Sequence, residues 1–399
     1  MIYLRNLKEY KKKYNSIIVL FIIKILSMGL KYLLVLYLSI QLLTPSEFGM
    51  FSLFLIILNF AYLFVGFGVI DTGMYLISRD NSKELCGATL FLTLIISILF
   101  SFVLMAALFY YKFEYFIVIG ILSCGFILNL FVKKISVGLH EKFSMYYFEF
   151  FMYLLSLILI ILFANDVYDS IFFYSIGMLI VSLFFILRLK PTFSNLNTNL
   201  GYLMRNIKGY GTSVHLSQFI AMGTYDLDKL MLKHFFGFTS VGVYNLALTF
   251  IMPVKLFSMS LSEMLFKDFA KEKKIKKEVF ILNLGISLVF SILLCIIGYY
   301  LIIFFYDQAY YEIIGYIYYL PILAVLSSIY VPINHFFSAK GLGKQKFINA
   351  VVLAISNIAF NFIFIPLFGV LGAIIATISA LIVNNIMFIY QYKLYTRKK

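Results

Sequence analysis

Twelve apolar runs follow one another along the chain, separated by short polar segments. They cover residues 17–43, 48–68, 86–111, 115–132, 145–164, 168–187, 207–235, 241–265, 279–305, 313–338, 346–366 and 370–392. A helix needs roughly 20 apolar residues to cross the hydrocarbon core of a bilayer. The pattern therefore predicts an all-α polytopic membrane protein with twelve transmembrane helices. The first run is far longer than the apolar core of a signal peptide, so we expect it to be a span.

The basic residues gather in alternate loops of this pattern. With the N-terminus in the cytoplasm, 27 of the 33 Lys and Arg residues lie in predicted cytoplasmic segments, and two, Lys112 and Lys233, lie in predicted outside loops. Membrane proteins carry this excess of Lys and Arg on the cytoplasmic side. We therefore predict that both termini are cytoplasmic. These loops also explain the net charge of +15, so we expect no nucleic-acid partner.

The composition agrees with a membrane protein and excludes a soluble one. Hydrophobic residues make up 63% of the 399 residues and charged residues 13%, and the mean hydropathy is +0.97. Soluble domains are about half apolar and about a quarter charged. The sequence has no Gly-x-x-x-x-Gly-Lys phosphate loop, no Ser-His-Asp arrangement and no cysteine spacing typical of metal ligands. We therefore expect a protein that is not an enzyme and holds no metal or cofactor, with coupling to H⁺ or Na⁺ left open.

The two halves of the chain resemble each other. Residues 46–53 (Ser-Glu-Phe-Gly-Met-Phe-Ser-Leu) match residues 239–246 (Thr-Ser-Val-Gly-Val-Tyr-Asn-Leu) at an offset of 193. Six helices per half give both halves one orientation, which predicts two six-helix lobes related by a pseudo-two-fold axis along the membrane normal. We predict a cytoplasmic tail at 1–16, an N-lobe at 17–188, a cytoplasmic linker at 189–206, a C-lobe at 207–392 and a cytoplasmic tail at 393–399. Transporters built in this way bind substrate between their halves.

Lysines inside the predicted spans are candidates for substrate binding. Lys24 and Lys31 are seven residues apart in the first span and share one face of a helix. Lys255 follows Pro253 in the eighth span, and Lys229 lies in the seventh. An ionisable group at mid-bilayer costs at least about 2.5 kcal/mol unless it faces water or a partner. We therefore interpret these four lysines as cavity cations for an anionic substrate such as a phosphate or pyrophosphate. For Lys24 the alternative is a side chain that reaches the cytoplasmic surface.

The acidic groups and one histidine in the spans have two interpretations each. Asp226 and Lys229 are i, i+3 neighbours, which favours an internal ion pair. Asp226 and Asp228 are alternatively candidates for coupling to H⁺ or Na⁺. Glu149 in the fifth span is either an interfacial carboxylate or a coupling group. His215 is either a hydrogen-bonded polar group or a residue that titrates near neutral pH.

Several short motifs follow one another in a characteristic order. They are Leu43–Leu53, Asp228–Leu230 with Gly237 and Val241–Ala247, Ser338–Lys346, and Asn361 with Ile365–Ala373. Together they resemble the signature regions of Wzx-type O-antigen and capsular polysaccharide repeat-unit flippases. These flippases belong to the multidrug/oligosaccharidyl-lipid/polysaccharide (MOP) exporter superfamily, which implies a MATE-like arrangement of helices.

The resemblance implies a flippase of the bacterial cytoplasmic (inner) membrane. Its substrate would be an undecaprenyl-diphosphate-linked oligosaccharide, moved by alternating access to the outer leaflet for O-antigen, capsule or exopolysaccharide assembly. Membrane lipids are expected partners, and contacts with the polysaccharide polymerase and chain-length machinery are left open. The alternatives are a lipid II flippase, a MATE-like drug antiporter and, more distantly, a membrane-embedded glycan polymerase. Two lysines in the first span disfavour the drug antiporter, and the short outside loops disfavour the polymerase.

Overall fold

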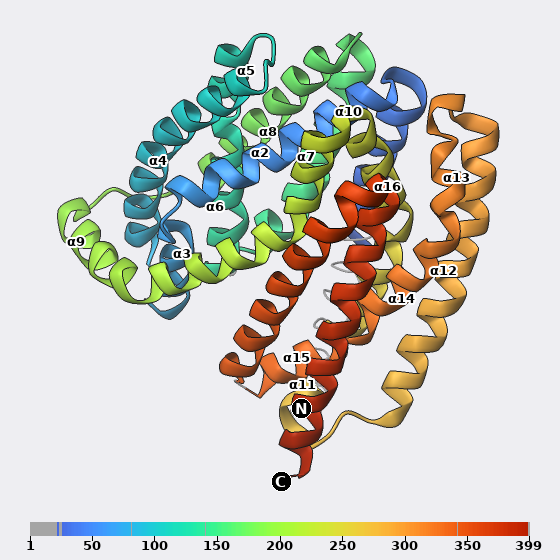
Figure 1. The fold of residues 1–399 in the computed structure, drawn as a ribbon. Coiled ribbons are helices and arrows are strands. Elements are labelled where there is room, and N and C mark those ends of the chain that lie inside the picture. Colours follow the sequence, from blue (N-terminus) through green and yellow to red (C-terminus); the bar gives the residue numbers. More distant parts are fainter. Residues whose placement is uncertain (1–21, 24–25, 81, 140, 341, 398–399) are drawn as a thin grey trace, which may run out of the picture. The chain divides into compact units, whose positions relative to one another are not determined.

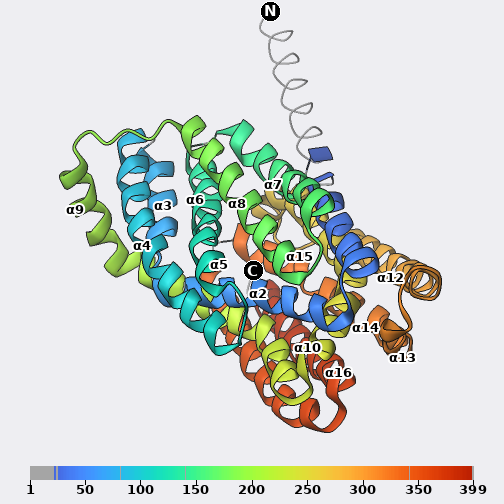
Figure 2. The same cartoon turned by 90° about the horizontal axis from the view of Figure 1, so that it is seen from above.

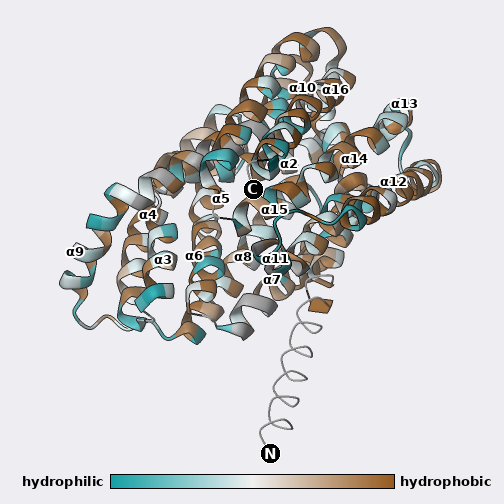
Figure 3. Ribbon diagram, turned by 90° about the horizontal axis from the view of Figure 1, so that it is seen from below, coloured by the Kyte–Doolittle hydropathy of each residue, from teal (hydrophilic) through white to brown (hydrophobic). Residues whose placement is uncertain are grey.

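A computed structural model describes residues 22–23, 26–80, 82–139, 141–340 and 342–397. These residues are almost entirely helical and contain no strand (Figure 1). The predicted all-α membrane fold is confirmed. Apolar residues cover most of each long helix (Figure 3), as expected for helices that face lipid or one another. Lys24 lies outside the described residues.

Among the described residues, eight helices are long and apolar enough to cross a bilayer, and the apolar segments Leu26–Leu42 and Tyr147–Phe163 are shorter. Two of the eight each contain a turn at a glycine with positive φ. These turns are at Gly237 (φ 84°) in α10 and at Gly369 (φ 57°) in α16. Each turn falls between two predicted spans. The total of twelve spans stays a prediction.

The chain divides into two compact units. The first contains the described residues up to Leu42 and Ile57–Leu216, and the second contains Leu43–Ile56 and the described residues from Ser217 onward. The division differs from the predicted lobes because the start of the second predicted span groups with the second unit.

Helices α3 to α9 form most of the first unit. Their bounds are α3 Val69–Asp80, α4 Lys83–Tyr110, α5 Phe116–Leu122, α6 Cys124–Gly138, α7 Lys142–Phe163, α8 Val167–Leu189 and α9 Leu196–Asn206. Helix α6 packs against α3, α4, α7 and α8 (Figure 2) and lies at the centre of this unit. A five-residue π-helix, Ile207–Gly211, follows α9.

Most of the second unit is built from α10 to α16. Their bounds are α10 Thr212–Met264, α11 Phe266–Lys271, α12 Lys277–Phe305, α13 Glu312–Tyr316, α14 Leu320–Ile329, α15 Val331–Ala339 and α16 Gly343–Arg397. Helix α14 packs against α12 and α16, and α15 packs against α11 and α16. Other parts of the protein leave most of α12 uncovered, which suits a helix that contacts lipid.

Three segments that the sequence predicted as loops contain helices. The predicted loop at 69–85 contains α3, whose Leu76 and Ile77 are fully buried. The predicted loop at 133–142 overlaps the end of α6, and the predicted linker at 189–206 contains α9. Helices α3 and α9 are short and mixed in polarity, so the criterion of 20 apolar residues does not detect them.

Helix α2, Pro45–Val65, begins with a capping box. The Glu47 carboxylate accepts hydrogen bonds from the Thr44 backbone N–H (2.9 Å) and hydroxyl (2.8 Å), and Pro45 occupies the first helical position. Capping satisfies backbone groups that a helix start leaves free, and proline is favoured at that position. The sequence Thr-Pro-Ser-Glu therefore fixes where α2 starts, and with it the position of Gly49 one turn later.

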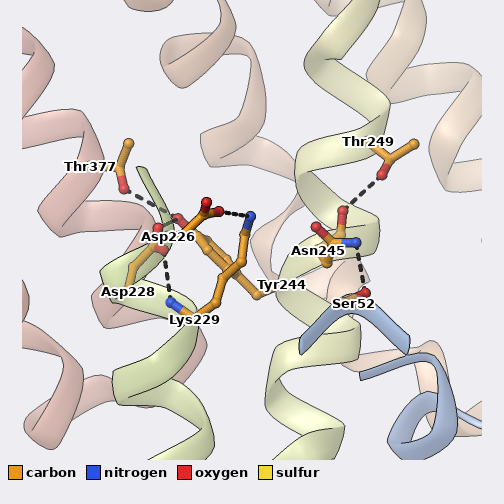
Figure 4. Close-up of polar contacts among 8 residues, drawn as sticks. All are labelled: Ser52, Asp226, Asp228, Lys229, Tyr244, Asn245, Thr249 and Thr377. Carbon is orange, nitrogen blue, oxygen red and sulfur yellow. Dashed lines mark hydrogen bonds and ion pairs between the residues drawn. The ribbon is translucent and has the colours of Figure 1, made fainter. Parts of the chain in front are cut away.

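Gly49 of α2 and Gly242 of α10 lie at a very close helix crossing within the second unit. A Cβ atom on Gly49 would overlap the Phe238 carbonyl, and one on Gly242 would overlap the Pro45 carbonyl. Asn245 Nδ2 donates a hydrogen bond to Ser52 Oγ at 2.8 Å (Figure 4). Glycine allows two backbones to approach this closely because it has no side chain.

The contacts at this crossing are reciprocal with respect to the sequence repeat. Pro45 and Phe238, Gly49 and Gly242, and Ser52 and Asn245 are each 193 residues apart, which is the offset of the repeat. Each repeat unit presents the same surface to the other, as in an isologous interface. The repeat motif is therefore a contact motif. The symmetry of the complete halves stays a prediction.

We expect Gly242→Ala to destabilise the protein, because the new methyl group meets backbone rather than a flexible side chain. Overpacking of this kind costs about 1–3 kcal/mol. Gly285→Ala in α12 is the matched control, since nothing lies within 4 Å of its Cβ position. The measurement is the thermal unfolding midpoint of the purified proteins in one detergent. Equal midpoints for the two variants would show that the crossing tolerates a side chain.

Candidate functional site

An acid–base cluster lies on α10 in the second unit (Figure 4). Lys229 Nζ forms an ion pair with Asp226 Oδ1 at 2.9 Å, and the two side chains are 14% and 16% exposed. This is the i, i+3 pair that the spacing favours. Burial makes the pairing important, because either charge alone would carry an uncompensated desolvation cost.

Asp228 is the most deeply buried member of the cluster, with 4% exposure. Its Oδ2 accepts a hydrogen bond from the Tyr244 hydroxyl at 2.6 Å, and its Oδ1 accepts one from the Lys229 backbone N–H at 2.7 Å. The Tyr244 hydroxyl also lies 3.2 Å from Thr377 Oγ1 on α16. Three segments of the second unit thus hold one carboxylate in place.

The charges of the cluster favour a small cation. Two carboxylates, Asp226 and Asp228, face one ammonium group, that of Lys229. With both acids ionised the cluster carries one net negative charge, which a proton or small cation would neutralise. The ion pair also neutralises Lys229, which makes this lysine a poor anchor for a diphosphate.

The other predicted cavity cations that the structure describes lie in different units. Lys31 is exposed in the apolar helical segment Leu26–Leu42 of the first unit. Lys255 is half-buried in α10 of the second unit, two residues after Pro253. Pro253 removes a backbone N–H from the middle of α10, a feature that membrane helices tolerate next to other polar groups.

Glu149 and His215 each have a partner in the first unit. Glu149 Oε1 lies 2.8 Å from Lys133 Nζ on α6, and both side chains are more than one third exposed. His215 Nε2 lies 2.8 Å from the Leu63 carbonyl oxygen. Because a carbonyl only accepts, Nε2 carries the proton and donates it. The roles of both residues stay predictions.

The comparisons with known proteins identify a family and a fold. Residues 40–278 match the model of a family described as polysaccharide biosynthesis protein. The chain belongs to this family of polysaccharide biosynthesis proteins. The match includes α2, the α10 cluster and the Gly49–Gly242 crossing. No curated protein matches the chain at a significant level.

Solved structures place the fold of this polysaccharide biosynthesis protein among MOP superfamily transporters. The lipid II flippase MurJ in an inward closed conformation matches with a TM-score of 0.70 at 16% identity, over 94% of this chain and 87% of that one. An inward-facing multidrug resistance MATE family transporter matches with a TM-score of 0.69 at 15% identity, over 93% and 96%. A MOP superfamily transporter from Pyrococcus furiosus matches with a TM-score of 0.61 at 16% identity, over 96% of each chain. At these identities the likeness shows a shared fold.

One buried ion pair of this polysaccharide biosynthesis protein was missed by the sequence analysis. Asp71 of α3 and Lys134 of α6 lie 2.6 Å apart, with side chains 5% and 22% exposed. Both residues lie in segments, 69–85 and 133–142, that were predicted to be cytoplasmic loops. Neither was therefore expected to be a buried charge. A single acid in the apolar stretch Val69–Ile77 was the signal that could have indicated it. Tyr244 was missed as well, because an aromatic residue in a span usually serves packing.

We expect Lys229→Met to destabilise this protein more than Asp226→Asn. The first change leaves two buried carboxylates without their ammonium group, whereas the second leaves Lys229 beside Asp228. Breaking a buried pair costs about 3–5 kcal/mol, so Lys229→Met should lower the unfolding midpoint by several degrees. The double variant Asp226→Asn/Lys229→Met should recover part of the loss.

Lys276→Met is the matched control, because its ion pair with Glu272 is solvent-exposed and such pairs contribute about 0–1 kcal/mol. The measurement is again the unfolding midpoint in detergent. An equal effect of Lys229→Met and Lys276→Met would contradict a role of the cluster in stability.

Proposed function

We propose that this protein is a flippase for lipid-linked oligosaccharides. It would translocate undecaprenyl-diphosphate-linked repeat units from the inner to the outer leaflet of the bacterial cytoplasmic membrane, by alternating access, for O-antigen, capsule or exopolysaccharide assembly. The observation that carries the proposal is the match of residues 40–278 to the polysaccharide biosynthesis family, in a chain with the fold of MOP transporters.

The substrate sets two physical requirements. The polyprenyl tail can stay in lipid, but the diphosphate and the sugars must be shielded from the hydrocarbon core. An unpaired charge there costs at least about 2.5 kcal/mol. Lys31 and Lys255 are lysines within apolar helices. We assign them, together with Lys24, to attraction of the diphosphate. Lys229 is withdrawn from this role because Asp226 neutralises it.

The acidic cluster suits the coupling step. Asp228 is buried, accepts two hydrogen bonds and lies beside Lys229. A proton or Na⁺ that bound there would remove the excess negative charge and shift the balance between conformations by its difference in affinity for them. We assign Asp228 to the bound cation and Asp226 to holding Lys229.

The same excess of carboxylate favours a second candidate function, a drug antiporter with cationic cargo. The two functions differ in what accumulates when the protein is absent. A flippase leaves a lipid-linked oligosaccharide in the membrane, whereas a drug antiporter leaves cells more sensitive to cationic compounds.

We expect Lys31→Ala to reduce surface polysaccharide at least several-fold when it replaces the wild-type protein in cells. Lys31→Arg should retain a substantial part, because the positive charge remains. The measurement is surface polysaccharide per cell at matched protein abundance in the membrane. Lys274→Ala, in the polar segment between α11 and α12, is the control and should have no effect. Normal polysaccharide in the Lys31→Ala strain would remove this lysine from the substrate site.

A further inference from the structure

Seven carboxamide side chains are buried in the second unit. We call them the asparagine track: Asn283, Asn349, Asn357, Asn361, Asn384, Asn385 and Gln391, each at most 8% exposed. Asn283 lies on α12 and the others lie on α16. Buried amides are expensive in a protein that faces lipid, because each carries donors and acceptors that water cannot reach. Their number calls for an explanation beyond packing.

A proline explains part of the track. Pro332 has no N–H, so it cannot satisfy the carbonyl of Ser328 four residues before it. The helix is interrupted there, between α14 and α15. Asn283 Nδ2 donates to the Ser328 carbonyl at 3.1 Å, which also accepts the Tyr330 N–H, and Asn385 Nδ2 donates to the Leu326 carbonyl at 2.9 Å. Two amides thus donate their NH₂ groups to carbonyls beside the helix interruption.

The rest of the track runs along the two halves of α16, which turn back at Gly369. The halves meet near the turn, where a Cβ on Gly372 would overlap the Phe364 carbonyl. They meet again far from it, where Asn349 Nδ2 donates to Gln391 Oε1 at 2.8 Å. Asn361 Nδ2 donates to Asn357 Oδ1 at 2.8 Å between these ends. From Asn361 to Asn349 the helix rises about 18 Å at 1.5 Å per residue.

Five of the seven side-chain oxygens of the track lack hydrogen-bond partners among the described residues. Among the described residues, the buried Oδ1 atoms of Asn283, Asn349, Asn361 and Asn385 have no hydrogen bond. Asn384 is 1% exposed, and both its Oδ1 and its Nδ2 are without one. Hydrogen bonds therefore occupy four of the amide donors but leave most of the side-chain oxygens of the described track without a partner. Each bare group costs about 1–3 kcal/mol, and buried polar groups of this kind are usually satisfied by internal water.

The track comes within two helical turns of a residue that contacts the acid–base cluster. Thr377, which contacts the Tyr244 hydroxyl, lies on the second half of α16, seven residues from Asn384. Two helical turns separate these residues, so they share a face. Tyr244 in turn donates to Asp228, which also faces Asp226 and Lys229. The other end, at Asn349 and Gln391, lies toward the C-terminal end of α16.

We propose that the asparagine track holds a file of internal waters that connects the Gln391 end of α16 with Asp228. The ligand is water, and its function is to deliver water and protons to the buried carboxylate. A proton that enters at one end is passed along the file and taken up by Asp228, while the amides orient the waters and do not titrate. The role in proton delivery rests on the proposed coupling function, whereas the presence of water does not.

Silver ions test the file because they are small, travel with water and react with thiols. In a variant that lacks Cys86, Cys124 and Cys295, we expect Asn384→Cys to react with Ag⁺ in membranes. Blocked labelling by a maleimide after denaturation measures this reaction. Ala376→Cys, in the same half of α16 and also fully buried, is the matched control and should stay unreacted. Normal abundance and a single size-exclusion peak establish that each variant is folded.

The outcomes are distinct. Reaction at position 384 at least tenfold faster than at position 376 supports the water file. Equal rates, whether both slow or both fast, overturn it, because they show either a dry interior or general water penetration. The path to the cluster is tested with Thr377→Cys. Adding Asn384→Leu should slow its reaction with Ag⁺ several-fold, and an unchanged rate would overturn the connection.

These measurements need no transport activity, so they separate the water file from the proposed function. A reactive Asn384→Cys in a protein whose absence leaves lipid-linked oligosaccharides unchanged would keep the file and reject the flippase. An unreactive Asn384→Cys in a protein whose absence causes lipid-linked oligosaccharides to accumulate would reject the file and keep the flippase.

Discussion

The close crossing of α2 and α10 is the constraint on which much of the second unit depends. Gly49 and Gly242 bring two backbones together so closely that a side chain on either would overlap a carbonyl of the other helix. The capping box at Thr44 and Glu47 fixes the start of α2 and so the register of the contact. The same helices carry the chain between the units, because α2 and α10 each have one end in either unit.

The candidate charged residues lie in two different environments, one buried and one exposed. In the described part of the chain, the second unit buries a cluster with two carboxylates and one ammonium group, whereas Lys31 is exposed on an apolar helix of the first. A buried excess of carboxylate suits a proton or small cation, and an accessible lysine suits a phosphate. The proposed flippase needs both, since its cargo is anionic and its movement requires a source of free energy. The division also explains why Lys229, unlike Lys31, is assigned to structure and coupling.

Hydrophobic patterning predicted the membrane fold because each long helix must be apolar over its whole length. It also placed both glycine turns, at Gly237 and Gly369, between predicted spans. It failed at α3 and α9, whose polarity is mixed, and so it missed the Asp71–Lys134 pair. The i, i+3 spacing indicated the Asp226–Lys229 contact, which is local. The Tyr244 partner of Asp228 and the unpaired acceptors of the asparagine track could not be predicted, because they depend on how helices and helix halves pack at sequence separations of 16 to 59 residues.

The proposed flippase moves a lipid-linked oligosaccharide across the membrane. Its most direct test is mass spectrometry of the lipid fraction from cells that lack the protein, beside cells complemented with it and in a strain without a second exporter of the family. We expect accumulation of an undecaprenyl-diphosphate oligosaccharide together with loss of surface polysaccharide, and reversal of both on complementation. An unchanged lipid fraction with normal surface polysaccharide would contradict it.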